Sequence, residues 1–292
     1  MAQQRYTLGF VGIGLMGQPL TLRLLASGFQ VNVWNRTTAK LAVVAGAGAK
    51  VCGSVSELVK TSDVVILCLA DTMAVEAVVM EHVIADGAAD KLLIDLSSIH
   101  PEATRRMASQ LRAACRMRWV DAPVSGGTAG AEQGSLAIMA GGAEQDIQIA
   151  REVLRPLYSR LTYMGPVGSG QTTKICNQMI VSCNVLVIAE MMALANSAGV
   201  DAAKIPEALA GGFADSKPLQ IVGPEMADQR FEPVKWRVKT LLKDLNMAVD
   251  LASKQGSAIP MSGLAAQLMQ LHGSSGFLDQ DPSTLIKLYA QD

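Results

Sequence analysis

The sequence has little charge, and no excess of one sign. Only 17% of its 292 residues are Asp, Glu, Lys or Arg, and the formal net charge is −1. A protein that mainly coats nucleic acid needs Lys and Arg against the phosphates, so no nucleic-acid partner is expected. Half of the residues are hydrophobic. A disordered chain combines low hydrophobicity with high net charge, so this composition predicts a large folded core.

Cysteine and histidine are too few and too scattered for a disulfide framework or a metal site. The five cysteines include no Cys-x-x-Cys pair, and their number is odd. This usage indicates reduced thiols and favours a cytoplasmic protein. The three histidines, His82, His100 and His272, have no regular ligand spacing. We therefore expect no bound metal.

The sequence predicts neither a signal peptide nor a membrane span. The order of a basic start, an apolar middle and a small-residue cleavage site is absent from the N-terminus. The most apolar stretch, Ile175–Ala195, contains Asn177, Gln178 and Glu190, which would be costly to bury in lipid. We expect a buried helix there, and no membrane partner.

Short apolar runs alternate with helix-like stretches in the first half of the chain. The runs are Leu8–Val11, Val31–Trp34, Val64–Leu69, Leu92–Leu96, Trp119–Ala122, Leu136–Ala140 and Leu161–Met164. The helical stretches are Met16–Ala26, Thr37–Ala45, Ser54–Thr61, Met73–Val79, Pro101–Cys115 and Ala143–Leu157. Ser54 and Glu57 have capping-box spacing, and Pro101 suits a first helical turn. This alternation predicts an α/β fold with a parallel sheet covered on both faces.

The predicted secondary structure changes after the turn-rich segment Gly165–Gly170. After it no strand is predicted, and 171–198 forms one long helix closed by Gly199. Further helical stretches follow at Ala202–Ala210, Val234–Gln255 and Ile259–Leu271. The prediction is a doubly wound sheet domain, residues 1–164, followed by an all-helical domain, residues 165–292, joined by a long helix.

A glycine-rich loop follows the first predicted strand and opens the first helix. Gly12, Gly14 and Gly17 have the spacing Gly-x-Gly-x-x-Gly, which allows a tight turn, close approach of a pyrophosphate and close helix packing. The helix N-terminus then offers free N–H groups to the phosphates. With Leu15 and Met16, these residues are the predicted dinucleotide-binding loop of a Rossmann-type domain. The alternative is a plain tight turn.

The end of the second predicted strand selects the nucleotide. NAD enzymes usually carry an acidic residue there, which holds the ribose hydroxyls. Here the strand is followed by Asn35, Arg36 and Thr37, with no carboxylate. Arg36 can pair with a 2′-phosphate through charge-assisted hydrogen bonds, so we predict that NADP(H) is preferred over NAD(H). The alternative is that Arg36 is a solvated charge and that Asn35 caps the following helix.

Four segments in order resemble the β-hydroxyacid dehydrogenase family, which includes 3-hydroxyisobutyrate dehydrogenase and tartronate semialdehyde reductase. They are the glycine loop continuing through Pro19, 121–127 followed by Gly130 and Ala131, 165–170 with Lys174 and Asn177, and 243–245. Their order and spacing match over nearly the whole sequence. The resemblance implies a dinucleotide domain, a helical domain, and a small acid substrate with a hydroxyl or aldehyde on its β-carbon.

The resemblance also implies that Lys174 is the catalytic residue. Hydride transfer to an aldehyde leaves charge on the carbonyl oxygen, so a proton donor must lie within hydrogen-bond reach. Asn177, three residues on, shares a helix face with Lys174 and is expected to orient the carbonyl or the lysine. The alternative for Lys174 is an ordinary solvated lysine, although a lysine near a helix N-terminus is mildly unfavourable.

The substrate carboxylate is expected at Ser125, Gly126 and Gly127. This segment resembles the family's substrate-binding signature, and it follows a predicted strand end, where ligands bind in such sheets. Small residues expose backbone N–H groups that can bind an anion. The alternative is a flexible turn between two strands.

Other positions follow the family's pattern only in part. The resemblance places Lys243 near the cofactor, with an exposed helical charge as the alternative. Leu69 and Ala70 match a segment in which a proline usually occupies the second position. Ser97 and Ser98 follow the next predicted strand and are expected near the nicotinamide. Arg23 stands where the family often has asparagine, and the sequence offers no reason for it.

These expectations combine into an NADP-preferring oxidoreductase that moves a hydride between the nicotinamide and the β-carbon of a short hydroxy or oxo acid. Lys174 acts as general acid in reduction and as general base in oxidation. The alternatives are an imine or other carbonyl reductase on the same scaffold, and a non-catalytic nucleotide-binding protein. The long apolar helix is too apolar to face water all round, which predicts a homodimer or homotetramer.

Overall fold

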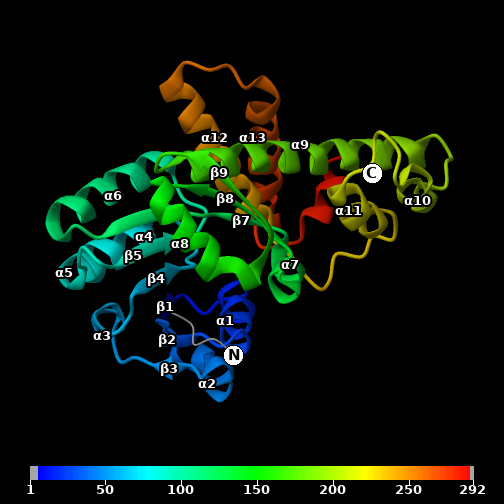
Figure 1. Ribbon diagram of the computed structural model, residues 1–292. Helices are drawn as coiled ribbons and strands as arrows, with labels where there is room; N and C mark the ends of the chain where they lie inside the picture. Colours follow the sequence, from blue (N-terminus) through cyan, green and yellow to red (C-terminus); the bar gives the residue numbers. More distant parts are fainter. Residues whose placement is uncertain (1–5, 290–292) are drawn as a thin grey trace. The chain divides into compact units, whose positions relative to one another are not determined.

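The computed structural model describes residues 6–289 (Figure 1). The chain forms two compact units, and the boundary between them in the sequence falls between Lys174 and Ile175. The first unit contains all described strands. The second is helical. The predicted fold class, a Rossmann-type sheet domain followed by a helical domain with a long helix, is confirmed.

The first unit is built on a nine-stranded sheet in the order β3-β2-β1-β4-β5-β6-β8-β7, with β9 beside β8. Strands β1 to β6 are parallel, whereas β8 is antiparallel to β6 and β7 and parallel to β9. The strands are β1 (Thr7–Val11), β2 (Gln30–Trp34), β3 (Lys50–Val51), β4 (Val64–Leu67), β5 (Leu92–Asp95), β6 (Arg118–Asp121), β7 (Val124–Ser125), β8 (Leu136–Gly141) and β9 (Tyr158–Gly165). The sheet is thus not parallel throughout, because β8 and β9 run opposite to β1 through β6.

Both faces of the parallel strands are buried, which explains their continuous apolar sequences. In β4, Val64 and Ile66 belong to one core cluster, whereas Val65 and Leu67 belong to another. The helical segments of this unit are α1 (Gly17–Ala26), η1 (Thr38–Leu41), α2 (Ala42–Gly46), α3 (Val55–Lys60), α4 (Thr72–Val78), η2 (Val79–Val83), α5 (Ile84–Asp86), α6 (Pro101–Cys115), α7 (Gly127–Gln133), α8 (Glu144–Leu154) and η3 (Arg155–Leu157).

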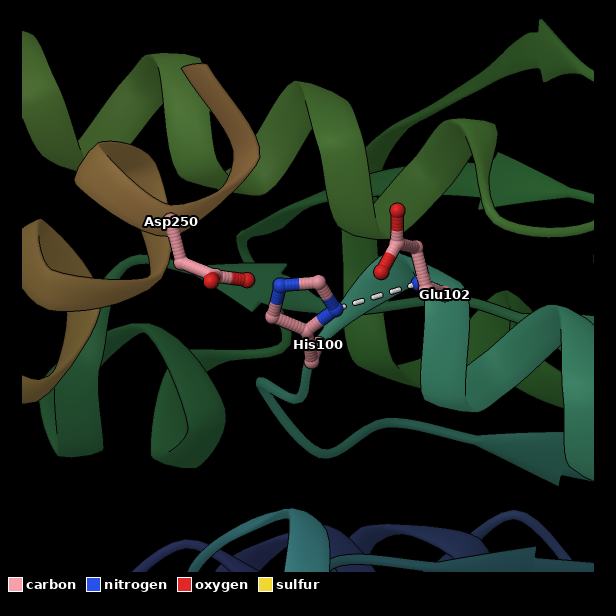
Figure 2. Close-up of side chains that lie close together, drawn as sticks. All are labelled: His100, Glu102 and Asp250. Carbon is pink, nitrogen blue, oxygen red and sulfur yellow. Dashed lines mark hydrogen bonds between the residues drawn. The ribbon is translucent and has the colours of Figure 1, made fainter. Parts of the chain in front are cut away.

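Two predicted helix starts have their expected caps. The N–H of Glu57 donates to Ser54 Oγ at 3.1 Å, while the Glu57 carboxylate accepts from Gly53 rather than from the cap residue itself. Pro101 opens α6, and the N–H of Glu102 donates to His100 Nδ1 at 3.2 Å (Figure 2). Local capping chemistry therefore sets both helix starts.

The second unit is built around α9 (Ser169–Ser197), whose first residues belong to the first unit (Figure 1). Its other helical segments are η4 (Ala202–Lys204), α10 (Ile205–Leu209), α11 (Lys217–Ala227), α12 (Val238–Gln255), α13 (Pro260–His272), η5 (Gly273–Phe277) and η6 (Pro282–Leu288). By length and composition α9 could cross a membrane. However, Val185, Ala189 and Met192 lie in the buried core of this unit, as expected for a core helix.

The structure differs from the sequence prediction in short or interrupted elements. Strands β3 and β7 have two residues each and were not predicted. Helix α11, which contains Pro224, lies within the segment 211–237, for which no helix bounds were predicted. Helix α12 begins at Val238 rather than Val234, and α7 occupies a segment for which only a turn was considered. Periodicity carries little information over such short segments.

Candidate cofactor and catalytic site

The three loop glycines occupy positions with different steric demands. Gly12 has φ +102°, and a Cβ there would overlap the carbonyl oxygen of Cys68. A Cβ on Gly17 would overlap the carbonyl oxygen of Gly12. At Gly14, by contrast, a Cβ would meet nothing within 4 Å. The first and third glycines are therefore required by the fold, whereas the second leaves open space beside the backbone, as a bound pyrophosphate requires.

The N-terminus of α1 has no side-chain cap. Met16 occupies the cap position without a side-chain hydrogen bond, and no acidic residue lies in the first turn. Leu15 is 83% exposed beside it. The first N–H groups of a helix need partners from outside the helix, and an anion at this point also gains from the helix dipole. The loop and helix therefore fit a dinucleotide phosphate.

Asn35 supports the glycine loop from the end of β2. Its Oδ1 accepts from the N–H of Ile13 at 2.9 Å, and its Nδ2 donates to the carbonyl of Thr37 at 2.8 Å. Thr37, not Asn35, is the cap residue of η1. The alternative in which Asn35 caps the next helix is therefore wrong. Arg36 is exposed at the same strand end.

Three other predicted cofactor residues lie at the same edge of the sheet. Leu69 and Ala70 follow β4, and Ser98 follows β5. The N–H of Leu69 donates to Ser97 Oγ at 2.9 Å, which joins the two strand ends. Because β2, β1, β4 and β5 are adjacent and parallel, their carboxyl ends and these residues form one edge. Ligands bind at this edge in open α/β sheets.

The predicted carboxylate loop follows β6, the next strand along the sheet. Ser125 pairs with Ala137 in β7 and β8. Gly126 and Gly127 have φ values of +138° and +63°, in the region that favours glycine. Gly126 caps α7 without a side-chain hydrogen bond, and α7 has no acidic residue in its first turn. This segment is thus a glycine-dependent turn that leads into α7. The first N–H groups of a helix need partners from outside it, and an anion can provide them.

Lys174 lies near the start of α9, where Asp121 at the end of β6 accepts backbone hydrogen bonds. The Asp121 carboxylate accepts from the N–H groups of Gly168 at 2.7 Å and Gln171 at 2.9 Å. Lys174 follows Gln171 by about one helical turn and is only 9% exposed. An ordinary solvated lysine does not fit this burial.

Two buried carboxyl groups lie side by side beneath this edge. Asp95 and Asp121 are register partners in β5 and β6, and both are fully buried. Burial raises the pKa of Asp95 to about 7, assisted by the charge of Asp121 and opposed by hydrogen bonds from Ser97. Burial likewise raises the pKa of Asp121 to about 6, against the backbone N–H groups that favour its charged form. The interior here disfavours two negative charges.

In the second unit, a hydrogen-bonded chain links two other predicted site residues, Asn177 and Lys243. Asn177 Nδ2 donates to Gln178 Oε1 at 2.8 Å, and Gln178 Nε2 donates to Asp244 Oδ2 at 2.6 Å. Lys243 Nζ lies 3.3 Å from Asp244 Oδ1. Gln178 and Asp244 are buried. Lys243 is therefore part of an internal network and not simply an exposed helical charge.

Sequence reasoning missed several residues that hold the site. Asp95, Gln171 and Gln178 were not assigned roles, although Asp95 ends an apolar strand and Gln178 lies in an apolar helix. Arg23, which had no explanation, donates to the carbonyls of Pro156 at 2.8 Å and Glu132 at 2.9 Å. It thereby ties α1, which follows the glycine loop, to the end of α7, which follows the carboxylate loop.

Comparison with known proteins gives two family matches that together span most of the chain. Residues 7–165 match the NAD-binding domain of 6-phosphogluconate dehydrogenase, and residues 168–289 match the NAD-binding family of NADP-dependent 3-hydroxyisobutyrate dehydrogenase. The chain is 32% identical to 2-hydroxy-3-oxopropionate reductase of Escherichia coli, covering 96% of each chain. It is also 32% identical to the mitochondrial 3-hydroxyisobutyrate dehydrogenase of Drosophila melanogaster, covering 98% of this chain and 90% of that one.

A solved structure shows the same architecture. The 3-hydroxyisobutyrate dehydrogenase of Mycobacterium tuberculosis with L-serine aligns with a TM-score of 0.89 at 28% identity, covering 99% of this chain and 100% of that chain. The similarity therefore includes both the sheet domain and the helical domain.

Proposed function

Because this chain belongs to the β-hydroxyacid dehydrogenase family of NAD(P)-dependent oxidoreductases, we propose that it transfers a hydride between NADP(H) and the β-carbon of a small β-hydroxy acid or semialdehyde acid. Tartronate semialdehyde and methylmalonate semialdehyde are the leading substrates, each with its corresponding hydroxy acid. The proposal depends most on Lys174, a buried lysine near the start of α9. Asp121 accepts backbone hydrogen bonds at this helix start, and Gln171 there donates to the segment that follows β5.

The preference for NADP(H) rests on the end of β2. No carboxylate is there to hold the ribose hydroxyls, and Asn35 is engaged with the glycine loop. Arg36 is exposed at this point, and a guanidinium forms strong charge-assisted hydrogen bonds with phosphate. NAD-binding sites usually have an acidic residue at this point, and this strand end lacks one.

Lys174 would donate a proton to the carbonyl oxygen during reduction and accept it from the hydroxyl during oxidation. The bound nicotinamide supplies or accepts the hydride. Asn177 lies three residues further along the same helix and would orient the oxygen or the amine. Ser125, Gly126 and Gly127 would hold the substrate carboxylate through their hydroxyl and backbone N–H groups.

In this proposal, residues 1–164 bind NADP(H), and residues 165–292 serve substrate binding and assembly. Helix α9 carries exposed apolar side chains at seven-residue spacing, Ile180, Val187 and Leu194, which are 66%, 54% and 71% exposed. Such a stripe is typical of a helix that packs against another subunit, so we propose a homodimer or homotetramer. The free cysteines favour a cytoplasmic enzyme.

The test follows the absorbance of NADPH and NADH with short aldehyde acids, short imines, and matched aldehydes that lack a carboxyl group. We expect an aldehyde acid to react best with NADPH, and Lys174→Ala to lose at least about 100-fold in kcat. The exposed Lys204→Ala is the matched control. Full activity of Lys174→Ala contradicts the mechanism, and best turnover of an imine contradicts the substrate class.

Arg36→Ala tests the cofactor preference separately. Loss of a charge-assisted contact with a phosphate should weaken NADPH binding about tenfold or more and leave NADH binding nearly unchanged. If the native protein prefers NADH tenfold, our interpretation of Arg36 is wrong.

A further inference from the structure

Gln171 connects the start of α9 to the segment that follows β5 through two hydrogen bonds of its side chain. Its side chain is 1% exposed. Its Nε2 donates to the carbonyl of Ser97 at 2.8 Å, and its Oε1 accepts from the N–H of Ile99 at 3.1 Å. Both polar ends of the amide are thus paired with backbone groups on either side of Ser98.

Asp121 holds the backbone of the same residue. Its carboxylate accepts from the N–H of Gln171 and from that of Gly168. Two glycines make room for this contact, since a Cβ on Gly141 would lie 2.7 Å from Asp121 Oδ1, and one on Gly170 would lie 2.8 Å from Asp121 Oδ2. The surroundings leave little freedom for the start of α9 to shift.

We infer that Gln171, anchored by Asp121, is a positioning residue that fixes Lys174 relative to the 97–99 segment. Lys174 follows Gln171 by about 4.5 Å along the helix axis, so a displacement at Gln171 is carried directly to the lysine. The inference rests on the proposed role of Lys174 as acid and base. A misplacement of about 1 Å can reduce a rate about 100-fold.

The test replaces Gln171 with methionine, which keeps the length of the side chain and removes both hydrogen bonds. Thr173→Ala is the control, because the Thr173 hydroxyl donates to the carbonyl of Ser169 within the same helix. We expect Gln171→Met to lower kcat about 10- to 100-fold, with KM for the aldehyde acid and Kd for NADPH changed less than about threefold. Thr173→Ala should retain the native kcat.

A kinetic isotope effect separates positioning from a loss of folded protein. With NADPH deuterated at the transferred position, slower chemistry in Gln171→Met should raise the isotope effect on kcat. A smaller fraction of active enzyme lowers kcat without changing this effect, and that result would overturn the inference. Asp121→Asn, which keeps the shape of the side chain, provides a second variant and should also raise the isotope effect.

Lys174→Ala in the same assay distinguishes the two proposals. If it abolishes turnover while Gln171→Met and Asp121→Asn react like the native protein with an unchanged isotope effect, the inference fails and the proposed function stands. If Lys174→Ala remains fully active, the proposed function itself fails.

Discussion

Replacing Asp95 with asparagine should stabilise the fold at neutral pH. Asp95 Oδ1 accepts from the N–H of Ser97 at 2.9 Å, whereas Oδ2 has no hydrogen-bond partner among the described residues. Burial, assisted by the charge of Asp121, raises the pKa of Asp95 to about 7 from its ordinary value of 3.8. The folded protein therefore binds this proton more tightly than the unfolded chain does.

The sign and size of the effect follow from proton linkage. The free energy of unfolding is highest where Asp95 is protonated in both states, below pH ~4, and it falls as pH rises toward ~7. A pKa difference of about 3 units corresponds to about 4 kcal/mol lost by pH 8. The Asp95→Asn variant avoids this loss but leaves a side-chain N–H without an acceptor, at a cost of about 1–3 kcal/mol. The net gain at pH 8 is about 1–3 kcal/mol.

Urea unfolding of the native protein and Asp95→Asn at pH 5 and pH 8 measures the effect. The advantage of the variant should grow by about 2–3 kcal/mol between these pH values, because most of the deprotonation penalty arises between them. Asp63→Asn, which replaces an exposed carboxyl just before β4, controls for the general effect of removing a negative charge. An equal difference at both pH values would refute the assigned protonation state of Asp95.

Three further predictions concern other parts of the chain. Gly14→Ala should fold normally, because its Cβ meets nothing within 4 Å, but it should weaken NADPH binding about tenfold or more in a fluorescence titration. Gly12→Ala, at φ +102°, should instead lower the thermal midpoint of unfolding. Arg23→Ala should lower the free energy of unfolding in urea by about 1–3 kcal/mol, because two carbonyls lose a charged donor. Burial and the charge of Lys287 lower the pKa of His272 to about 4. The free energy of unfolding should therefore fall as pH drops from ~6.5 toward 4. In urea titrations at acid pH, His272→Gln should show a smaller fall.

The sequence predicts the parts of the fold that rest on local chemistry. Apolar runs of four or more residues, such as Val64–Leu67, indicated buried strands because both faces of the sheet are covered. The glycine loop was identified because its steric demands arise within a few residues. The antiparallel position of β8 was not predicted. The direction of β8 depends on the path of the Gly-rich connection between Asp121 and Leu136, and no local sequence pattern predicts that path.

The candidate site was predictable only where a motif repeats the family's spacing. Lys174, Asn177 and the carboxylate loop were predicted as site residues in this way. Gln171 was not, because its partners Ser97 and Ile99 lie more than 70 residues away in the sequence. The same holds for Gln178, whose partner Asp244 is 66 residues away. A buried amide in an apolar helix is a usable signal, but the sequence alone does not tell which backbone groups it meets.

These buried amides restrict how the apolar helix α9 can lie in the fold. A polar group in a protein interior is costly unless its hydrogen bonds are made, so a paired amide permits one rotation and one axial position of its helix. Helix α9 is fixed in this way twice, by Gln171 within the first unit and by Gln178 within the second. Lys174 and Asn177 lie between these two anchors along the chain. Apolar packing alone would hold α9 in place, but it would discriminate less strongly between neighbouring rotations, and these set where the lysine amine lies.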